Sequence, residues 1–268
     1  MMKNKKTMAV SLITVCLIAL LVILVQSKTT DKSVSASVDT PTLVSKLFNS
    51  HNLWKTIRGT ANITYYNADG AVQQTFKDQF AYSADGLVAV EVNQIDGAQS
   101  VRTMTFISDG VTAMQVMWDA GTYVVQSTEH FMQDLTALPT SASQIETRDG
   151  FPVIKRHPIA MLSPDPLVDF LFPVGLAQRQ GIYEVVGADE ISGRKTTVVE
   201  YFWAADDVLP AARYWVDDEI GIILQVHNLD QEKPDRVLGE ITLTTLSIDQ
   251  PIEPFIIFPQ TDGLKKEN

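Results

Sequence analysis

Three consecutive acidic residues, Asp217, Asp218 and Glu219, are of the type that binds a cation or transfers a proton. They lie between two alternating runs, ARYWV and IILQV, and Gly221 follows them, which is the pattern of a hairpin loop. Adjacent residues point in different directions, so three carboxylates in a row rarely converge on one ion, and the alternate-acid spacing of a calcium loop is absent. We predict a hairpin turn, with a cation site or a catalytic site as the alternatives.

The other residues that could do chemistry form no recognisable site. His51, His130, His157 and His227 lie far apart in the sequence, without the spacing of zinc ligands. No serine stands in a G-x-S-x-G elbow, and neither a dinucleotide-binding nor a phosphate-binding glycine loop occurs. We therefore predict no catalytic residue, no metal, no cofactor and a protein that is not an enzyme. A hydrolase is the weakest alternative, because it would need a nucleophile that the sequence does not reveal.

Methionine, aromatic and aliphatic residues predict either a ligand cavity or an ordinary core. Such adaptable side chains suit a cavity for a flexible apolar ligand. By strand alternation Met114, Val116 and Trp118 share one face, as do Met104 and Phe106 on the preceding strand. The candidate ligand-binding residues are Met104, Phe106, Met114, Val116, Trp118, Phe131, Met132, Met161, Leu162, Phe170 and Phe172.

The N-terminal segment predicts a membrane anchor. A basic tail over residues 1–7 precedes residues 8–26, which carry no charge and would form a helix about as long as the roughly 30 Å core of a bilayer. The lysines before it place the N-terminus in the cytoplasm and the remaining chain outside, beyond a polar tether over 27–39. Two alternatives stay open, cleavage of a signal peptide after Ala36 and lipidation at Cys16.

The composition is that of a globular protein with a sizeable core. Of the 268 residues, 45% are hydrophobic and 8% aromatic, which excludes the disordered class and favours one domain after the anchor. The net charge of -11 argues against nucleic acid and against adhesion to anionic lipid head groups. Cys16 is the only cysteine, so no disulfide framework supports the fold.

Alternating apolar and polar residues predict a β-rich fold of ten or eleven antiparallel strands. The turn signals NADG, SADG, IDGA, SDG and DAG separate the first of these, and the pattern returns from residue 181. The first predicted strands are 56–66, 72–83, 86–95, 101–108, 111–118 and 121–127.

Short helices are predicted outside the strand-rich regions. One begins at Thr40 and Pro41, and another is predicted in STEHFMQDLTAL. The following segment contains five prolines, which forbid a regular strand or a long helix, and Ser163 is expected to cap a short helix that runs through Leu171. We therefore predict a lid-like insert between about 129 and 180.

Several segments resemble one known family. LWKTIRGTANITYYNADG, FISDGVTAMQV, YEVVGADEISGRKTTVVEY, ARYWVDDEIGIILQVHNLDQ and LGEITLTTLSIDQPIEPFIIF are similar to the domain shared by the LolA/LolB lipoprotein carriers and the sigma-E regulators MucB/RseB. The resemblance covers residues 40–258. It implies a mainly β (α+β) fold, in which a strongly curved antiparallel sheet forms an unclosed barrel with a helical lid over a hydrophobic cavity. It also implies that the Asp217 to Gly221 segment is a hairpin turn.

The resemblance implies binding of acyl chains without catalysis. The carriers have a cleaved leader and the outer-membrane receptor is lipid-anchored, whereas this chain is expected to keep its membrane span. We therefore expect a single-pass protein of the cell membrane, whose extracytoplasmic domain (40–258, followed by a polar tail over 259–268) holds an acyl chain, lipid or lipoprotein. The alternative is an envelope-stress sensor or sigma-factor regulator of the MucB/RseB type, which binds a membrane partner protein. No nucleic acid partner is expected.

Overall fold

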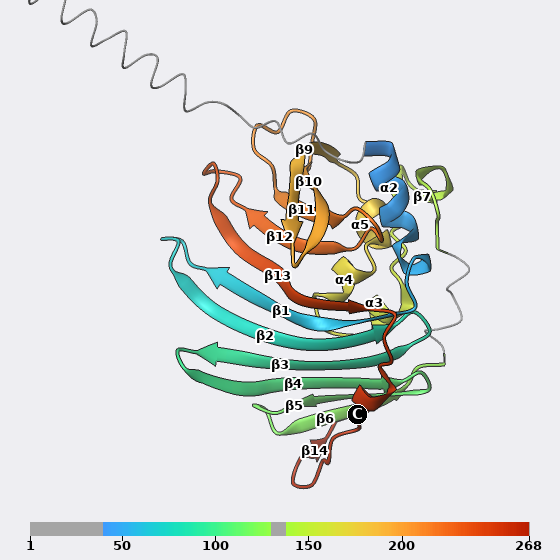
Figure 1. Ribbon diagram of the computed structural model, residues 1–268, viewed down its shortest axis with the longest axis vertical. Helices are drawn as coiled ribbons and strands as arrows, with labels where there is room; N and C mark the ends of the chain where they lie inside the picture. Colours follow the sequence, from blue (N-terminus) through green and yellow to red (C-terminus); the bar gives the residue numbers. More distant parts are fainter. Residues whose placement is uncertain (1–39, 130–137, 268) are drawn as a thin grey trace, which may run out of the picture. The chain divides into compact units, whose positions relative to one another are not determined.

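The computed structural model describes residues 40–129 and 138–267, and these form a mainly β protein with a few short helices (Figure 1). The predicted fold class is confirmed to this extent. The predicted anchor, the tether and most of the predicted helix at 127–138, including Phe131 and Met132, lie outside the described residues. Within the described ranges, no helix is long and apolar enough to cross a membrane.

One large sheet contains twelve strands. They are β1 (Thr56–Tyr66), β2 (Val72–Ser83), β3 (Leu87–Asp96), β4 (Gln99–Asp109), β5 (Thr112–Met117), β6 (Thr122–Ser127), β9 (Ile182–Ile191), β10 (Arg194–Phe202), β11 (Ala212–Asp217), β12 (Ile223–Leu229), β13 (Val237–Ile248) and β14 (Lys265–Lys266). The six strands predicted before residue 128 match β1 to β6 within two residues at each end. Alternation and Gly-containing turns were therefore sufficient signals for this half of the sheet.

The sheet joins two meanders through a single central pair. Its order is β14-β6-β5-β4-β3-β2-β1-β13-β12-β11-β10-β9, in which β1 pairs with β2 on one side and with β13 on the other. All neighbours are antiparallel except β14, which lies parallel to β6. The prediction of ten or eleven antiparallel strands missed this short parallel strand, because two lysines near the chain end give no strand signal.

The strands curve, and Figure 1 shows the sheet bending from β14 at one edge to β9 at the other. Irregular register interrupts several pairs, including β1–β13 at Thr60/Ala61 and β3–β4 at Val92/Asn93. Such bulges bend a strand and increase its twist. Gly59 precedes the first bulge, and a Cβ there would lie 2.0 Å from the carbonyl oxygen of Thr245, so only glycine lets β1 and β13 approach this closely.

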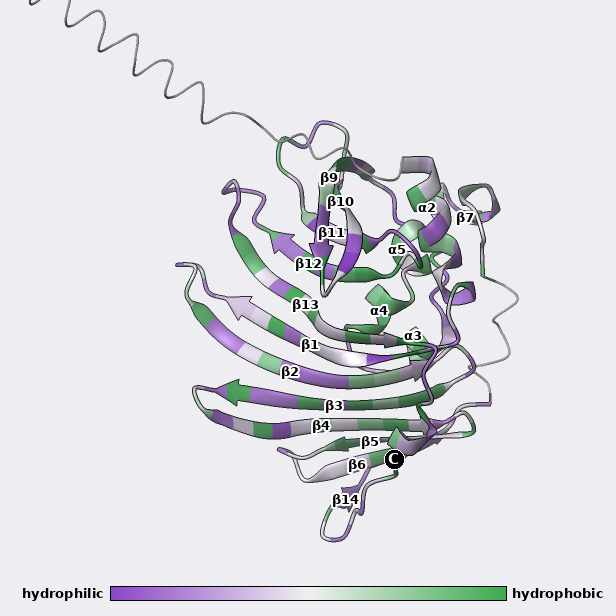
Figure 2. Cartoon of the chain, in the orientation of Figure 1, coloured by the Kyte–Doolittle hydropathy of each residue, from purple (hydrophilic) through white to green (hydrophobic). Residues whose placement is uncertain are grey.

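Short helices cover one face of the sheet. They are α2 (Thr40–Asn49), α3 (Pro158–Leu162), α4 (Val168–Leu171) and α5 (Val174–Ala177), with 3-10 turns η1 (Ser50–Asn52), η3 (Ala142–Gln144) and η4 (Glu253–Phe255) and a small hairpin of β7 (Thr147–Arg148) and β8 (Phe151–Pro152). The four residues of α4 include Val168 and Leu171, both buried, and α4 is coloured as hydrophobic in Figure 2.

The helix predicted from Ser163 through Leu171 is wrong in its start. Ser163 is the C-cap residue that follows α3, and α4 begins only at Val168. Pro164 and Pro166 separate the two helices, because proline cannot donate a backbone hydrogen bond and disfavours a helical residue before it. The side chain of Asp165, not that of Ser163, accepts the hydrogen bond from the Leu167 N–H that precedes α4.

The two faces of the sheet have different surroundings. On the face that we call the helix face, Tyr82, Val90 and Phe106 belong to the same buried cluster as Leu162 and Phe172 of the helical region. This cluster extends from β5 to β12. A second cluster lies between β9–β12 and helices α2 and α5. We call the opposite face the outer face. Side chains alternate between the two faces along a strand, so the residues directly before and after Phe106 and Val90 point to the outer face.

Candidate functional site

The helix face brings together five of the predicted ligand-binding residues. Phe106, Leu162 and Phe172 are buried in its core cluster, and Met104 and Phe170 are half-buried against that cluster. They come from β4, from the end of α3 and from α4 and the residue after it. A strand and a proline-broken insert, far apart in sequence, therefore share one apolar surface.

Three other predicted residues lie on the outer face. Met114 pairs with Ile107 and Val116 pairs with Thr105, so their side chains point away from Phe106. The Trp118 indole N–H donates to the Thr105 hydroxyl at 2.8 Å, which places Trp118 on the outer face too.

Met114, Val116 and Trp118 share a face, but it is the face opposite to Met104 and Phe106. The pairing register between β4 and β5 determines which residues of the two strands share a face, and the alternation within either strand alone does not predict it. Met161 of α3 is 61% exposed, and Phe131 and Met132 lie outside the described residues. The members of the set that the structure describes are therefore divided between two faces of the sheet and the exposed Met161, and ligand binding by any of the eleven stays a prediction.

Half-buried apolar side chains border the core of the helix face. We call Phe76, Val92, Met104 and Phe170 the apolar rim; each packs against the buried cluster while part of its surface remains accessible. Val92 and Met104 lie directly opposite one another on β3 and β4, and the ring of Phe76 meets that of Tyr65 edge-on at 6.4 Å. Sequence reasoning missed Phe76 and Val92, although their alternation with Asp78 and Val90 identifies the same face.

A cluster of buried polar side chains lies where the insert contacts the sheet. The Tyr82 hydroxyl donates to Oδ2 of Asp165 at 3.1 Å and lies 3.3 Å from the hydroxyl of Ser163. Asp78 is fully buried beside Asp165, and neither of its carboxylate oxygens has an N–H or O–H partner among the described residues. Two ionised carboxylates cannot hydrogen-bond to each other, so a proton between Asp78 and Asp165 supplies the bond that both need.

Burial sets the protonation of this pair. Burial, followed by the charge of Asp165 and a hydrogen bond to it, raises the pKa of Asp78 to about 8. Burial also raises the pKa of Asp165 to about 6, although the Leu167 N–H and the Tyr82 hydroxyl oppose that rise. The pair therefore retains a proton at neutral pH. It forms a buried polar contact in an otherwise apolar region.

His157 is a buried packing residue at the start of α3. Its ring stacks on Phe172 with 4.1 Å between ring centroids, and its Nδ1 accepts a hydrogen bond from the Ile159 N–H. Burial, with a smaller effect from His51, lowers the pKa of His157 to about 3, so the ring is neutral near pH 7. A neutral imidazole stacked in this way caps α3 and supports Phe172.

The acidic residues at 217–219 form the turn between β11 and β12. Asp217 is buried; its Oδ1 accepts from the N–H groups of Glu219 and Ile220 at 2.9 and 2.8 Å, and both of its oxygens contact the guanidinium of Arg194. Asp218 accepts from the Thr197 hydroxyl at 2.7 Å, and Glu219 pairs with Arg194 at 2.9 Å.

The hairpin turn that the sequence predicts is therefore present; Asp217 and Glu219 both contact Arg194, and Asp218 accepts from Thr197. Gly221, with φ +70°, packs so closely on α2 that a Cβ would lie 2.8 Å from the Lys46 carbonyl oxygen. No group of three histidine, cysteine, aspartate or glutamate residues suited to a metal ion occurs in ranges 40–129 and 138–267.

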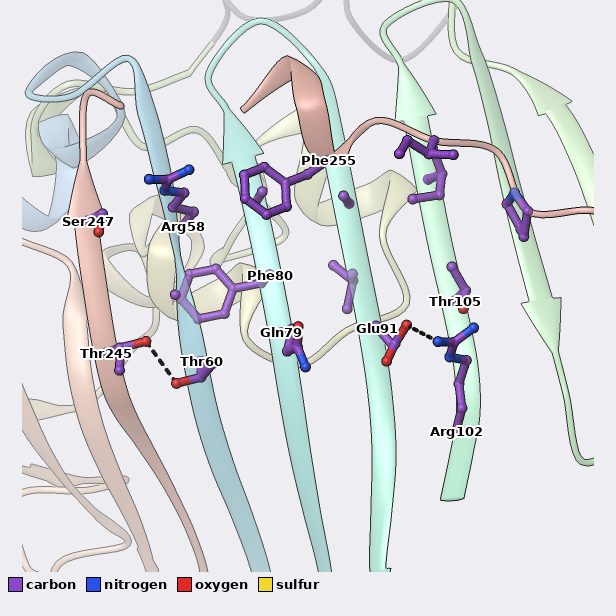
Figure 3. A pocket seen from close by; sticks show the side chains of 17 residues that line it. Arg58, Thr60, Gln79, Phe80, Glu91, Arg102, Thr105, Thr245, Ser247 and Phe255 are labelled. Atoms are coloured by element: carbon purple, nitrogen blue, oxygen red, sulfur yellow. Dashed lines mark hydrogen bonds and ion pairs between the residues drawn. The ribbon is translucent and has the colours of Figure 1, made fainter. Parts of the chain in front are cut away.

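The outer face contains a pocket of about 640 Å³, which we call the outer pocket (Figure 3). Its floor is formed by β13, β1, β2, β3 and β4, and residues 255–259 form one wall. In Figure 3 Phe255 reaches over the strands near Arg58, while Glu91 and Arg102 form an ion pair of 2.7 Å at another side. The sequence reasoning did not predict this pocket, because it assigned all ligand contacts to the face covered by the insert.

Comparison with known proteins gives distant structural matches. No protein-family model and no curated protein matches the chain. Among solved structures, MucB of Pseudomonas aeruginosa in its complex with MucA matches 85% of this chain, with a TM-score of 0.45 and 16% identity. The match covers 63% of the MucB chain, so this chain spans less than two thirds of that protein's length.

Two further matches cover almost the whole of the other chain. The lipoprotein LppX of Mycobacterium tuberculosis aligns over 80% of this chain and 99% of its own, with a TM-score of 0.39 and 15% identity. A LolA superfamily protein from Nitrosomonas europaea aligns over 83% of this chain and 99% of its own, with a TM-score of 0.31 and 10% identity. The predicted resemblance to MucB and to the LolA superfamily is thus confirmed as a distant structural similarity.

Proposed function

We propose that this chain is a membrane-anchored extracytoplasmic binding protein that holds an acyl chain, of a lipid or a lipoprotein, on the helix face of its sheet without catalysis. The apolar rim carries this proposal. Phe76, Val92, Met104 and Phe170 continue the buried core toward solvent, and a flexible acyl chain is the kind of ligand that irregular apolar side chains accommodate.

The construction of the lid supports the same proposal. Helices α3, α4 and α5 have only five, four and four residues, and side-chain packing holds them to the sheet. Elements with few hydrogen bonds of their own open at a lower free energy than the central strands of a sheet. An acyl chain can therefore enter between α4 and the strand residues of the rim, Phe76, Val92 and Met104, while the sheet stays intact.

Binding without catalysis agrees with the chemistry of the buried polar groups. His157 is neutral, and its ring stacks on Phe172 within the insert. Asp78 and Asp165 share a proton at neutral pH, and Tyr82 donates to that pair. Each of these groups contacts others in the core, through ring stacking or a hydrogen bond, so we assign them to the fold and to the environment of the ligand.

Binding of palmitate that carries a fluorescent anthroyloxy group tests the proposal on the full chain in phosphatidylcholine nanodiscs, with empty nanodiscs as the blank. Phe170→Ala and Phe76→Ala should each weaken binding about tenfold, since each removes an aromatic contact at the ligand. Phe151→Ala is the matched control, because Phe151 is 67% exposed in the separate β8 strand and should not affect binding.

The contradicting result is a folded wild-type chain that binds no fatty acid above the blank. Pull-down of a membrane protein partner by that same chain would then favour the alternative function, an envelope-stress sensor or sigma-factor regulator. Equal losses for Phe170→Ala and Phe151→Ala would also contradict the assignment of the ligand to the helix face.

A further inference from the structure

Small apolar side chains form a trough across the outer face. Ala81 of β2 lies opposite Ala89 of β3, which lies opposite Ile107 of β4. The exposed face of an antiparallel sheet is ordinarily polar, because water covers it. Here the short side chains of two alanines form an apolar depression between larger neighbouring side chains. Ala81, Ala89 and Ile107 are buried, because part of residues 252–259 packs over them, and they are also among the residues that line the outer pocket.

Residues 252–259 divide their apolar side chains between the trough and the pocket. Ile252 is fully buried against the trough, and Ile256 and Phe258 pack on the same cluster. Phe255 and Ile257 line the outer pocket instead, where they are 48% and 70% exposed. Large apolar side chains exposed beside an apolar hollow are characteristic of a binding site.

Arg58 supplies a cation at one end of the trough. It lies opposite Ala81, its Nη1 donates to the Pro251 carbonyl oxygen at 3.3 Å, and its guanidinium carbon lies 5.2 Å from the centre of the Phe255 ring (Figure 3). In the part of the chain that the structure describes, no carboxylate forms an ion pair with Arg58, whereas Arg102 is neutralised by Glu91. A guanidinium has five N–H donors, so Arg58 retains donors for an anion.

We propose that the outer pocket is a second binding site, which takes a single-chain amphiphile with an anionic head group. The apolar chain lies in the outer pocket against Phe255 and Ile257, and the carboxylate or phosphate head binds Arg58. The volume of about 640 Å³ is within the range of roughly 300–1,000 Å³ typical of small-molecule sites. This site is separate from the helix-face site and does not depend on it.

The sheet itself favours an amphiphile over an extended peptide at this place. Peptides that bind to sheets usually add a strand at an edge, where backbone groups are unpaired. The pocket lies over β13 and β1 to β4, each of which has hydrogen-bonded neighbours on both sides. The lining also contains polar side chains, among them Arg102 paired with Glu91, but Arg58 is its cation without a carboxylate partner among the described residues. Arg58 beside apolar side chains complements an apolar chain with an anionic head.

The test uses the full chain in phosphatidylcholine nanodiscs with dansyl-undecanoate as the fluorescent probe. Arg58→Gln should weaken binding of this probe about tenfold or more, because a charge-assisted contact to the head group is lost. Arg148→Gln is the matched control, since Arg148 is exposed in β7, and it should leave binding unchanged. Competition by laurate and by dodecyl phosphate distinguishes a fatty acid from a phosphate-headed lipid, and dodecanol tests whether the anion is needed.

Additional variants separate this site from the helix-face site. Ile257→Gln should weaken binding several-fold without unfolding the chain, since its side chain is largely exposed. The loss from Arg58→Gln should be equally large in wild type and in Phe170→Ala. The proposal is overturned if Arg58→Gln binds the probe as wild type does, if dodecanol competes as well as laurate, or if Phe170→Ala alone abolishes all binding of the probe.

Discussion

Asp217 joins two strands and the turn between them. Its carboxylate accepts the N–H groups of Glu219 and Ile220 and contacts the guanidinium of Arg194, which begins β10. Asp217 thereby stabilises the β11–β12 turn and links it to β10. Only one of three adjacent acidic residues has this structural role, because only Asp217 points into the protein.

Asp217→Ala should therefore destabilise the protein by about 2–4 kcal/mol, since it leaves two N–H groups without their acceptor and the partly buried guanidinium of Arg194 with only the exposed Glu219. Asp218→Asn with Glu219→Gln should change stability by about 0.5 kcal/mol or less, because Glu219 is exposed and an amide oxygen can still accept from Thr197. Urea unfolding of both variants checks this. Equal stabilities for the two would show that Asp217 does not hold the turn.

The buried pair of Asp78 and Asp165 should make stability depend on pH. Burial raises the pKa of Asp78 from 3.8 to about 8, so the folded chain holds a proton that the unfolded chain releases. That contribution is fully present below the unfolded pKa and is lost as pH rises through about 8. Between pH 7 and 8.5, where the unfolded histidines have already lost most of their protons, the free energy of unfolding should fall by roughly 1 kcal/mol.

Asp78→Asn is the variant that isolates this effect. An asparagine amide donates permanently to Asp165, so the fall in unfolding free energy between pH 7 and 8.5 should largely disappear. Urea unfolding at several pH values measures both profiles. Parallel profiles for wild type and Asp78→Asn would mean that the two carboxyl groups do not share a proton at neutral pH.

Strands β1 to β6 and the insert differ in how far their sequences define them. Each of the six strands alternates, β1 to β5 each end at a turn with glycine, and the predicted bounds match within two residues. In the insert, prolines correctly predicted short helices, but the start of α4 depends on Asp165 and on its hydrogen bond to the Leu167 N–H. The outward direction of Met114 and Trp118 depends on the β4–β5 register, which involves two strands at once and is not a property of one segment.

The lid should respond to a ligand more than the sheet does. Amide hydrogen exchange of residues 158–172, which include α3 and α4, should be faster than that of β1 and β2, because these short helices have few internal hydrogen bonds. Added palmitate should slow exchange in residues 158–172 and leave β10 and β11 unchanged. The account of the lid is wrong if palmitate slows β10 and residues 158–172 equally or has no effect on either.

At the scale of the molecule, the sheet separates two apolar surfaces. The helix face holds the core and the apolar rim, and the outer face holds the trough and Arg58. The fold class and the packing of the insert on strand residues such as Phe106 could be predicted from the sequence. The outer pocket could not, because it requires residues 252–259 to cross strands that are distant in sequence, and only their tertiary packing brings Ile252 onto Ala81 and Ala89.

The proposed anchor is tested by the N-terminus of the protein recovered from cells. The uncharged segment 8–26 is long enough to span a bilayer, so the chain should remain in the membrane fraction with its sequence beginning at or near Met1. Mass spectrometry of the intact protein measures this directly. Recovery of a chain that begins at Ser37 in the soluble fraction would instead establish cleavage of the leader.

The central claim, that an acyl chain binds on the helix face, is tested most directly by photo-crosslinking. Full-length protein in membranes is irradiated with a fatty acid that carries a diazirine near its methyl end, and labelled peptides are identified by mass spectrometry. We predict labels on Phe76, Met104 and Phe170 that excess oleate suppresses, whether or not Arg58→Gln is present. Labels confined to residues 255–259 and the outer strands, or none outside the membrane anchor, would contradict the claim.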